Sequence, residues 1–262
     1  MPTFTINNHN LYYETHGDPA NPPMVLLHQG LGASMEWASQ IAYFSGDYHV
    51  IVFDRWGYGR SDPRSHFEYG YLRPDTDEAI ALLDSLGVKE ACVLGHSDGG
   101  TIALLLAAQR PDLARAMAVE AAHIYYEPKI QAGIEAMLEK VQTSRRIQAV
   151  LKMLHGDKAQ ALAEAWLTHW LDPASVPPDL VAEETLPQVR CPVLVIQGEE
   201  DEYATPKHAE DIHAALPHSE LWLIPGCGHT PHAALGEEFC ERVAAFFRDC
   251  GESEKGVTRE ED

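Results

Sequence analysis

The chain has 262 residues, 45% of them hydrophobic, so it is long enough to bury one sizeable core. Its formal net charge is −21, with 19 Lys and Arg against 40 Asp and Glu. Such a charge repels the phosphate backbone of nucleic acids and the anionic surface of membranes. We therefore expect neither as a partner, while the composition leaves the oligomeric state open.

The cysteines indicate a reducing compartment. Five are present, an odd number, and none forms a C-x-x-C pair, which argues against a disulfide framework and against a zinc site. Residues 1–10 lack the basic start and apolar core of a signal peptide, and no run approaches the roughly 18 apolar residues of a membrane span. The sequence predicts an unexported, cytoplasmic protein.

Short apolar runs recur along the chain with helical patterns between them, which predicts an α/β fold. The first two runs alternate polar and apolar residues around the turn-like Asn7, Asn8 and His9, as in a hairpin at a sheet edge. The later runs are almost continuously apolar, as in strands buried on both faces of a parallel sheet. The expected strands are residues 3–6, 10–15, 24–28, 49–54, 91–95, 115–119, 192–197 and 220–224, with helices at 77–86 and 102–109.

The alternation fails once, at residues 123–187, where helical periodicity continues without a convincing strand. We interpret this segment as a helical cap inserted into a core domain made of residues 1–122 and 188–250. Residues 251–262 are polar and acidic, and we expect them to be disordered.

Apolar residues of the cap recur at helical spacing, for example Ile130, Ile134 and Leu162. Most of them can simply pack the cap on the sheet. Alternatively, some wall an apolar pocket for an acyl group, a role we consider first for Trp166 and Trp170.

Ser97 is the candidate nucleophile. It lies in the sequence G-H-S-D-G-G, directly after the predicted strand 91–95 and before a helical pattern. A G-x-S-x-G match alone is weak, but a nucleophile on a tight strand-to-helix turn needs flanking glycines, because the backbone there is strained and crowded. The following helix N-terminus favours negative charge near the serine. The alternative is a buried serine at an ordinary turn.

A serine hydroxyl needs an imidazole to take its proton and a carboxylate to orient that imidazole. The strand 192–197 is followed by four carboxylates at residues 199–202, and the strand 220–224 by a glycine-rich loop that ends at His229. The chain order serine, acid, histidine is that of the α/β-hydrolase fold. These residues alone leave the acid open among the four carboxylates and Glu120, which ends another predicted strand. The alternative for His229 is that it is an ordinary surface-loop histidine, one of 14 histidines in the chain.

An oxyanion needs two backbone N–H donors, one after the nucleophile and one on an earlier strand-to-helix loop. Asp98 supplies the first, and Gly30, in the glycine-rich loop 28–32, is our candidate for the second. The Asp98 side chain has two readings. It either stabilises the helix N-terminus or faces the pocket, where it would attract a substrate with a cationic amino group.

Five segments together resemble the α/β-hydrolase superfamily over nearly the whole chain. They are HQGLGASMEW, FDRWGYGRSD, GHSDGG, VIQGEED and PGCGH. Among its subgroups, the sequence is most similar to capped, cofactor-free esterases related to biphenyl-hydrolase-like and pimeloyl-ester enzymes. The resemblance implies a mostly parallel eight-stranded sheet flanked by helices, an inserted helical cap, and neither a metal nor an organic cofactor.

The resemblance also implies roles for individual residues. It makes Ser97 the nucleophile, Asp201 the acid and His229 the base, with Gly30 and Asp98 as oxyanion donors. Gln29 departs from the family pattern, which usually has glycine after the residue equivalent to His28, and we count it among the candidate substrate contacts with Trp166 and Trp170.

We therefore predict a serine hydrolase that cleaves a small-molecule carboxylic ester through an acyl-enzyme intermediate. Haloalkane dehalogenases and epoxide hydrolases of the superfamily are disfavoured, because they place an aspartate where this chain has Ser97. Hydrolases of carbon–carbon bonds share the serine and remain an alternative. The non-enzymatic alternative is a ligand receptor built on the same scaffold, because a fold does not determine a function.

Overall fold

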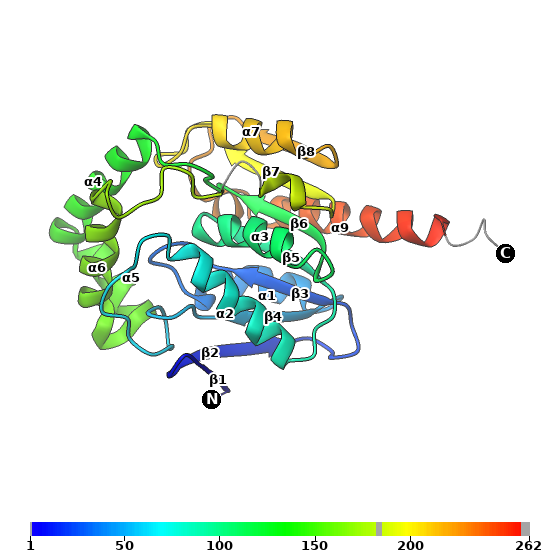
Figure 1. Ribbon diagram of the computed structural model, residues 1–262, viewed down its shortest axis with the longest axis horizontal. Helices are drawn as coiled ribbons and strands as arrows, with labels where there is room; N and C mark the ends of the chain where they lie inside the picture. Colours follow the sequence, from blue (N-terminus) through cyan, green and yellow to red (C-terminus); the bar gives the residue numbers. More distant parts are fainter. Residues whose placement is uncertain (1, 182–184, 258–262) are drawn as a thin grey trace.

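The computed structural model describes residues 2–181 and 185–257 (Figure 1). All the predicted strands are confirmed, each to within one residue at either end. They are β1 (Thr3–Ile6), β2 (His9–His16), β3 (Pro23–Leu27), β4 (His49–Phe53), β5 (Ala91–His96), β6 (Ala114–Glu120), β7 (Val193–Gly198) and β8 (Ser219–Ile224).

The strands form one eight-stranded sheet in the order β1-β2-β4-β3-β5-β6-β7-β8. The pairs β1–β2 and β2–β4 are antiparallel, and the pairs from β4 to β8 are parallel. The predicted hairpin at the sheet edge turns through Asn7 and Asn8, whose φ angles are 48° and 64°. Asparagine is one of the few residues that tolerate this left-handed conformation. The mostly parallel eight-stranded α/β sheet is thus confirmed.

Helices cover both faces of the sheet. Successive strand residues point to opposite sides, so an apolar strand places apolar side chains on both faces, and each face needs a cover. Val25 and Leu27 belong to the core under one group of helices, whereas Met24 and Leu26 belong to the core under the other. The first group is α2 (Leu72–Ser85), α3 (Asp98–Gln109) and α7 (Lys207–Ala215). The second is α1 (Ala38–Phe44) and α9 (Glu237–Val257). Of the short connecting elements, η1 (Ser34–Trp37) and α8 (Pro231–Leu235) lie with this second group, and η3 (Leu186–Gln188) lies with the first.

Two helices begin earlier than the sequence predicted. Helix α2 starts at Leu72 rather than at residue 77, because Pro74 lies in the first turn, where a missing N–H costs nothing. Helix α3 starts at Asp98 rather than at residue 102, although Gly99 and Gly100 are weak helix formers. Tertiary packing outweighs local propensity at the start of α3.

The cap consists of α4 (Pro128–Thr143), α5 (Arg145–His155), η2 (Gly156–Lys158) and α6 (Ala159–Leu171). These elements stand together beyond one end of the sheet, on the left in Figure 1. An isolated antiparallel bridge joins Tyr125 to Asp179, so the two ends of the insertion are tied to each other.

The C-terminal segment differs from expectation. Helix α9 continues to Val257, so the prediction of disorder from residue 251 is wrong as far as residue 257. Glutamate and lysine are good helix formers and no proline interrupts this stretch, which allows the helix to continue. Residues 258–262 lie outside the described residues. Within the described residues, the helices lack the length and apolar character needed to cross a membrane.

Candidate active site

Ser97 occupies a strained turn between β5 and α3, with φ 54° and ψ −119°. This left-handed backbone is costly for a residue other than glycine. The chain around it is crowded: a Cβ atom at Gly95 would lie 2.2 Å from the carbonyl oxygen of Gly99, and one at Gly99 would lie 2.1 Å from that of Leu27. The Ser97 N–H donates to the carbonyl of Glu120 at 2.8 Å, so neighbouring β6 holds the turn in place.

A cavity of about 60 Å³ opens beside the Ser97 side chain. It lies between the loop after β3, the turn after β5, helices α4 and α6 of the cap, and the loops after β7 and β8. Seven of the residues selected from the sequence line it: Gln29, Gly30, Ser97, Asp98, Trp166, Trp170 and His229. Asp201 is not among the lining residues.

Asp201 lies against the imidazole of His229. Its Oδ2 is 2.8 Å from His229 Nδ1 and also accepts a hydrogen bond from Gln197 Nε2 at 2.8 Å. Its Oδ1 accepts the N–H groups of Tyr203 at 2.7 Å and Ala204 at 3.1 Å. Burial by itself would raise the pKa of Asp201, but the contact with His229 and the two amides lowers it well below the ordinary value. An ionised carboxylate accepts the Nδ1 proton and leaves Nε2 of His229 as the basic nitrogen.

The other candidate acids do not contact that ring. Glu202 Oε2 accepts the backbone N–H of His229 at 3.0 Å, and Glu120 contacts His232 instead. Glu199 and Glu200 are exposed. Asp201 is therefore the carboxylate that meets the geometric requirement for an orienting acid.

Glu120, His232 and His96 form a buried cluster behind His229. His232 Nδ1 lies 2.8 Å from Glu120 Oε2, and His96 Nε2 donates to the carbonyl of His229 at 2.8 Å. Burial lowers the pKa of His96 to about 3, so it is neutral near pH 7. One ligand atom from each of these three residues lies within 4.8 Å of the others, and such donors suit a divalent metal. Their hydrogen bonds instead attach the His229 loop to the strand ends beside Ser97.

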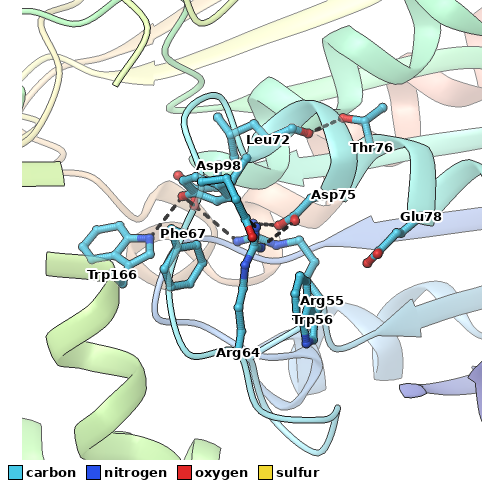
Figure 2. Close-up of polar contacts among 12 residues, drawn as sticks. Arg55, Trp56, Arg64, Phe67, Leu72, Asp75, Thr76, Glu78, Asp98 and Trp166 are labelled. Carbon is cyan, nitrogen blue, oxygen red and sulfur yellow. Dashed lines mark hydrogen bonds and ion pairs between the residues drawn. The ribbon is translucent and has the colours of Figure 1, made fainter. Parts of the chain in front are cut away.

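A chain of buried charges leads away from Asp98 (Figure 2). Arg55 Nη2 lies 3.3 Å from Asp98 Oδ2, and Arg55 Nη1 lies 3.1 Å from Asp75 Oδ2. Arg64 Nη1 contacts the other oxygen of Asp75 at 2.8 Å. Burial would raise the pKa of Asp98, but His123, Arg55 and Tyr71 together lower it well below the ordinary value. The negative charge of Asp98 is thus balanced inside the protein.

Tyr71 connects this chain of charges to the cap. Its hydroxyl donates to Asp98 Oδ2 at 2.6 Å and accepts the indole N–H groups of Trp166 at 3.2 Å and Trp170 at 3.1 Å. One donor and two acceptor positions are all that a phenol offers. Helix α6 is therefore hydrogen-bonded, through one buried hydroxyl, to the residue that follows Ser97.

Gly30 and Gln29 contact residues of the same network, namely Trp166 and Arg55. A Cβ atom at Gly30 would lie 2.4 Å from the Trp166 ring, so the cap packs directly on this loop. The Gln29 carbonyl accepts a hydrogen bond from Arg55 Nη2 at 3.0 Å, while its side chain donates to Glu36 Oε1 at 3.2 Å. The departure from glycine is accommodated because the Gln29 side chain has its own partner.

Sequence reasoning did not select three residues of the site. His123 and Tyr203 line the cavity, and Tyr71 organises its wall. His123 and Tyr203 follow β6 and β7 at the edge of the sheet where Ser97 lies, and this position is a signal that was available in the sequence. Tyr71 carried no such signal, because its hydrogen-bond partners come from two distant segments, the start of α3 and helix α6.

The sequence profile described as the Alpha/beta hydrolase family matches residues 24–245. The chain belongs to this family. The eight-stranded sheet and the flanking helices of this alpha/beta hydrolase agree with solved structures such as the enol-lactonase from Burkholderia xenovorans LB400. That likeness has a TM-score of 0.75 and 24% identity, and it covers 94% of this chain and all of the other.

Two relatives with known names are similar in sequence to this alpha/beta hydrolase. The serine hydrolase BPHL of Homo sapiens is 28% identical, over 93% of this chain and 84% of the relative. An (E)-2-((N-methylformamido)methylene)succinate hydrolase of Acinetobacter baylyi is 29% identical, over 92% of this chain and 95% of the relative. The expected likeness to biphenyl-hydrolase-like proteins is confirmed, and the family consists of hydrolases that differ in the bond they cleave.

Proposed function

We propose that the protein hydrolyses small carboxylic esters through an acyl-enzyme intermediate on Ser97. The observation that carries this proposal is the 2.8 Å contact between Asp201 Oδ2 and His229 Nδ1, at the edge of a cavity that both His229 and Ser97 line. A carboxylate in this position fixes the imidazole tautomer that a serine nucleophile requires.

In the first half of the reaction, Ser97 Oγ attacks the ester carbonyl while His229 Nε2 takes the hydroxyl proton. The negative oxygen is stabilised by the backbone N–H groups of Asp98 and Gly30. The amide of Asp98 is suited to this because it lies in the first turn of α3, where N–H groups have no partner within the helix. The bond to the alcohol then breaks, and His229 gives the proton to the leaving oxygen.

In the second half, His229 Nε2 takes a proton from a water molecule that attacks the acyl carbon. The acid is released, and the proton returns to Ser97 Oγ. The buried carboxylate of Asp201 stabilises the imidazolium in both halves, because its low pKa keeps it ionised.

The relatives support hydrolysis in general, and the contact between Asp201 and His229 beside Ser97 supports a serine nucleophile. Gln29, Trp166 and Trp170 are proposed to contact the substrate, because they line the cavity next to Ser97. We further propose action in the cytoplasm without nucleic acid or membrane partners. This is supported by the acidic composition and by Cys92, Cys191, Cys227 and Cys240, which form no disulfide within the described residues.

The test is rapid mixing with p-nitrophenyl esters of increasing chain length, beside a dienone diketone as a carbon–carbon substrate. We expect a burst of p-nitrophenol stoichiometric with enzyme, followed by steady turnover, because an acyl-enzyme forms before it is hydrolysed. Cleavage of the diketone without ester turnover would move the assignment to carbon–carbon hydrolysis. Binding of both compounds without product would indicate a receptor.

A further inference from the structure

His123 is held rigidly at the cavity wall, three residues beyond the end of β6. Its carbonyl accepts the hydroxyl of Thr101 at 2.7 Å, and its ring packs edge-on against Trp170 with the centroids 5.3 Å apart. The side chain is 8% exposed and lines the same cavity as Ser97. Its position is therefore set by the protein before any ligand arrives.

The Nε2 atom of His123 is buried and forms no hydrogen bond with any described residue. Asp98 Oδ1 lies 3.5 Å from this nitrogen, beyond the usual N–H···O distance. We place a proton on this nitrogen, because a lone pair directed at a carboxylate would be repelled. The other oxygen of that carboxylate is already engaged by Tyr71 and Arg55.

The cavity wall thus presents one N–H donor and one carboxylate acceptor side by side. A hydroxyl group can satisfy both, because it accepts from His123 and donates to Asp98. An ammonium group cannot accept from His123, and a carboxylate can neither donate to Asp98 nor avoid its charge. A methoxy group accepts but does not donate.

The size of the cavity limits the rest of the acyl group. A volume of about 60 Å³ holds on the order of four to six water-sized groups. Ile130, Ile134 and Met137 make the part of the wall that α4 supplies apolar. An acyl chain of a few carbons bearing one hydroxyl matches both the space and the chemistry.

We propose that the acyl site is built for short hydroxyacyl esters, with His123 and Asp98 binding the substrate hydroxyl. This inference rests on the proposed function, and it makes His123 a specificity-determining residue.

The experiment compares kcat/KM for p-nitrophenyl butyrate with kcat/KM for its 2-, 3- and 4-hydroxy derivatives. The position of the His123 imidazole relative to Ser97 selects which of these hydroxyl groups is bound. At the preferred carbon, we expect the hydroxy ester to be favoured about tenfold or more over butyrate, as one buried hydrogen bond pair allows. The matching methoxy and amino esters should lose that advantage.

The variants test whether the effect depends on His123. His123→Phe keeps a ring against Trp170 and should bring the hydroxy-to-plain ratio close to one, while butyrate is still hydrolysed. His123→Leu also removes the N–H donor and is the second variant, with the same expected ratio, used if the first does not fold as judged by circular dichroism. His169→Phe is the control, because His169 is also buried against Trp170 but does not line the cavity, and its ratio should stay at the wild-type value.

The outcomes separate this inference from the proposed function. Normal hydrolysis of butyrate with no preference for any hydroxy derivative would overturn the hydroxyl site and leave the esterase intact. A preference that survives unchanged in His123→Phe would also overturn it, as would a stronger preference for the amino ester. If no ester is hydrolysed, both the hydroxyl site and the proposed function are overturned.

Discussion

Glu120 and His232 form a buried pair at the end of β6: Oε2 of Glu120 lies 2.8 Å from Nδ1 of His232, and Oε1 accepts the N–H of His232 at 2.8 Å. Because His232 follows His229 by three residues, this pair attaches the loop of the proposed base to the strand beside Ser97. The Ser97 N–H donates to the Glu120 carbonyl, so one residue contacts both segments.

The Glu120–His232 pair predicts a stability contribution that depends on pH. Burial opposes both charges, but each partner offsets this for the other, so the pKa of Glu120 is lowered and that of His232 is raised. The stability that ionised Glu120 contributes is lost as pH falls below the ordinary glutamate pKa of 4.5 and through the lowered pKa of Glu120. The stability that protonated His232 contributes is lost as pH rises above the ordinary histidine pKa of 6.5 and through the raised pKa of His232. We expect Glu120→Gln to cost about 3 kcal/mol between these values and less on either side.

Urea denaturation of wild type and Glu120→Gln at pH 3.5, 5.5 and 9 measures this difference. Glu199→Gln, on the exposed loop after β7, serves as the control and should change stability little at any pH. A difference that is independent of pH would contradict an ionic pair and indicate a packing role.

Ser97→Ala is expected to abolish ester turnover, with a loss of several orders of magnitude in kcat, because the members of a triad act as a unit. The fold should remain intact, because the change removes only the side-chain hydroxyl, and the backbone N–H of residue 97 keeps its hydrogen bond to the Glu120 carbonyl. Steady-state kinetics with a p-nitrophenyl ester measures the loss. Retention of more than about a tenth of the activity would remove Ser97 from the mechanism.

Asp201→Asn should be far more damaging to kcat than Glu200→Gln. The asparagine amide can donate toward His229 Nδ1 and stabilise the wrong tautomer, which costs on the order of 10⁴-fold in serine proteases. Glu200 is exposed and is the matched control, whereas Glu202 is less suitable because it accepts the N–H of His229. Equal losses in Asp201→Asn and Glu120→Gln would reopen the choice of acid.

Asp98→Asn tests whether the Asp98 charge selects cationic substrates. Arg55 already balances that charge, so we expect the ratio of kcat/KM for an α-amino ester to that for its uncharged analogue to change by less than about threefold. Stability should fall by about 3 kcal/mol instead, because Arg55 loses one of its buried carboxylate partners. A tenfold fall in the ratio would show that the carboxylate attracts the amino group.

Tyr71→Phe should loosen the contact between the cap and the core. Two buried indole N–H groups, of Trp166 and Trp170, lose their acceptor, at about 1 to 3 kcal/mol each. The control is Tyr126→Phe, which removes a hydroxyl bonded to the Trp170 carbonyl but leaves Asp98 untouched. Denaturation and KM are compared for both, and equal effects would argue against a special role for Tyr71.

The sequence by itself determined the elements whose pattern is local. The nearly continuous apolar runs predicted β3 to β8, as expected of strands inside a parallel sheet, and the alternating runs predicted the edge hairpin of β1 and β2. The glycines around Ser97 and the strand-end positions of residues 199–202 and of His229 predicted which loops meet, since parallel strands present their carboxyl ends at one edge. Where a helix starts was predicted less well, because packing supports Gly99 and Gly100 in α3 despite their weak propensity.

Only the tertiary structure decided between residues that share a chemistry. Four carboxylates follow β7, and the one on the imidazole is selected by a distance that no local pattern encodes. The balance of the Asp98 charge by Arg55, and the meeting of two tryptophans at the Tyr71 hydroxyl, join segments far apart in the chain. Such buried polar contacts are fixed by the packing of the cap on the core, because a buried charge or N–H group must find its partner wherever the fold places one.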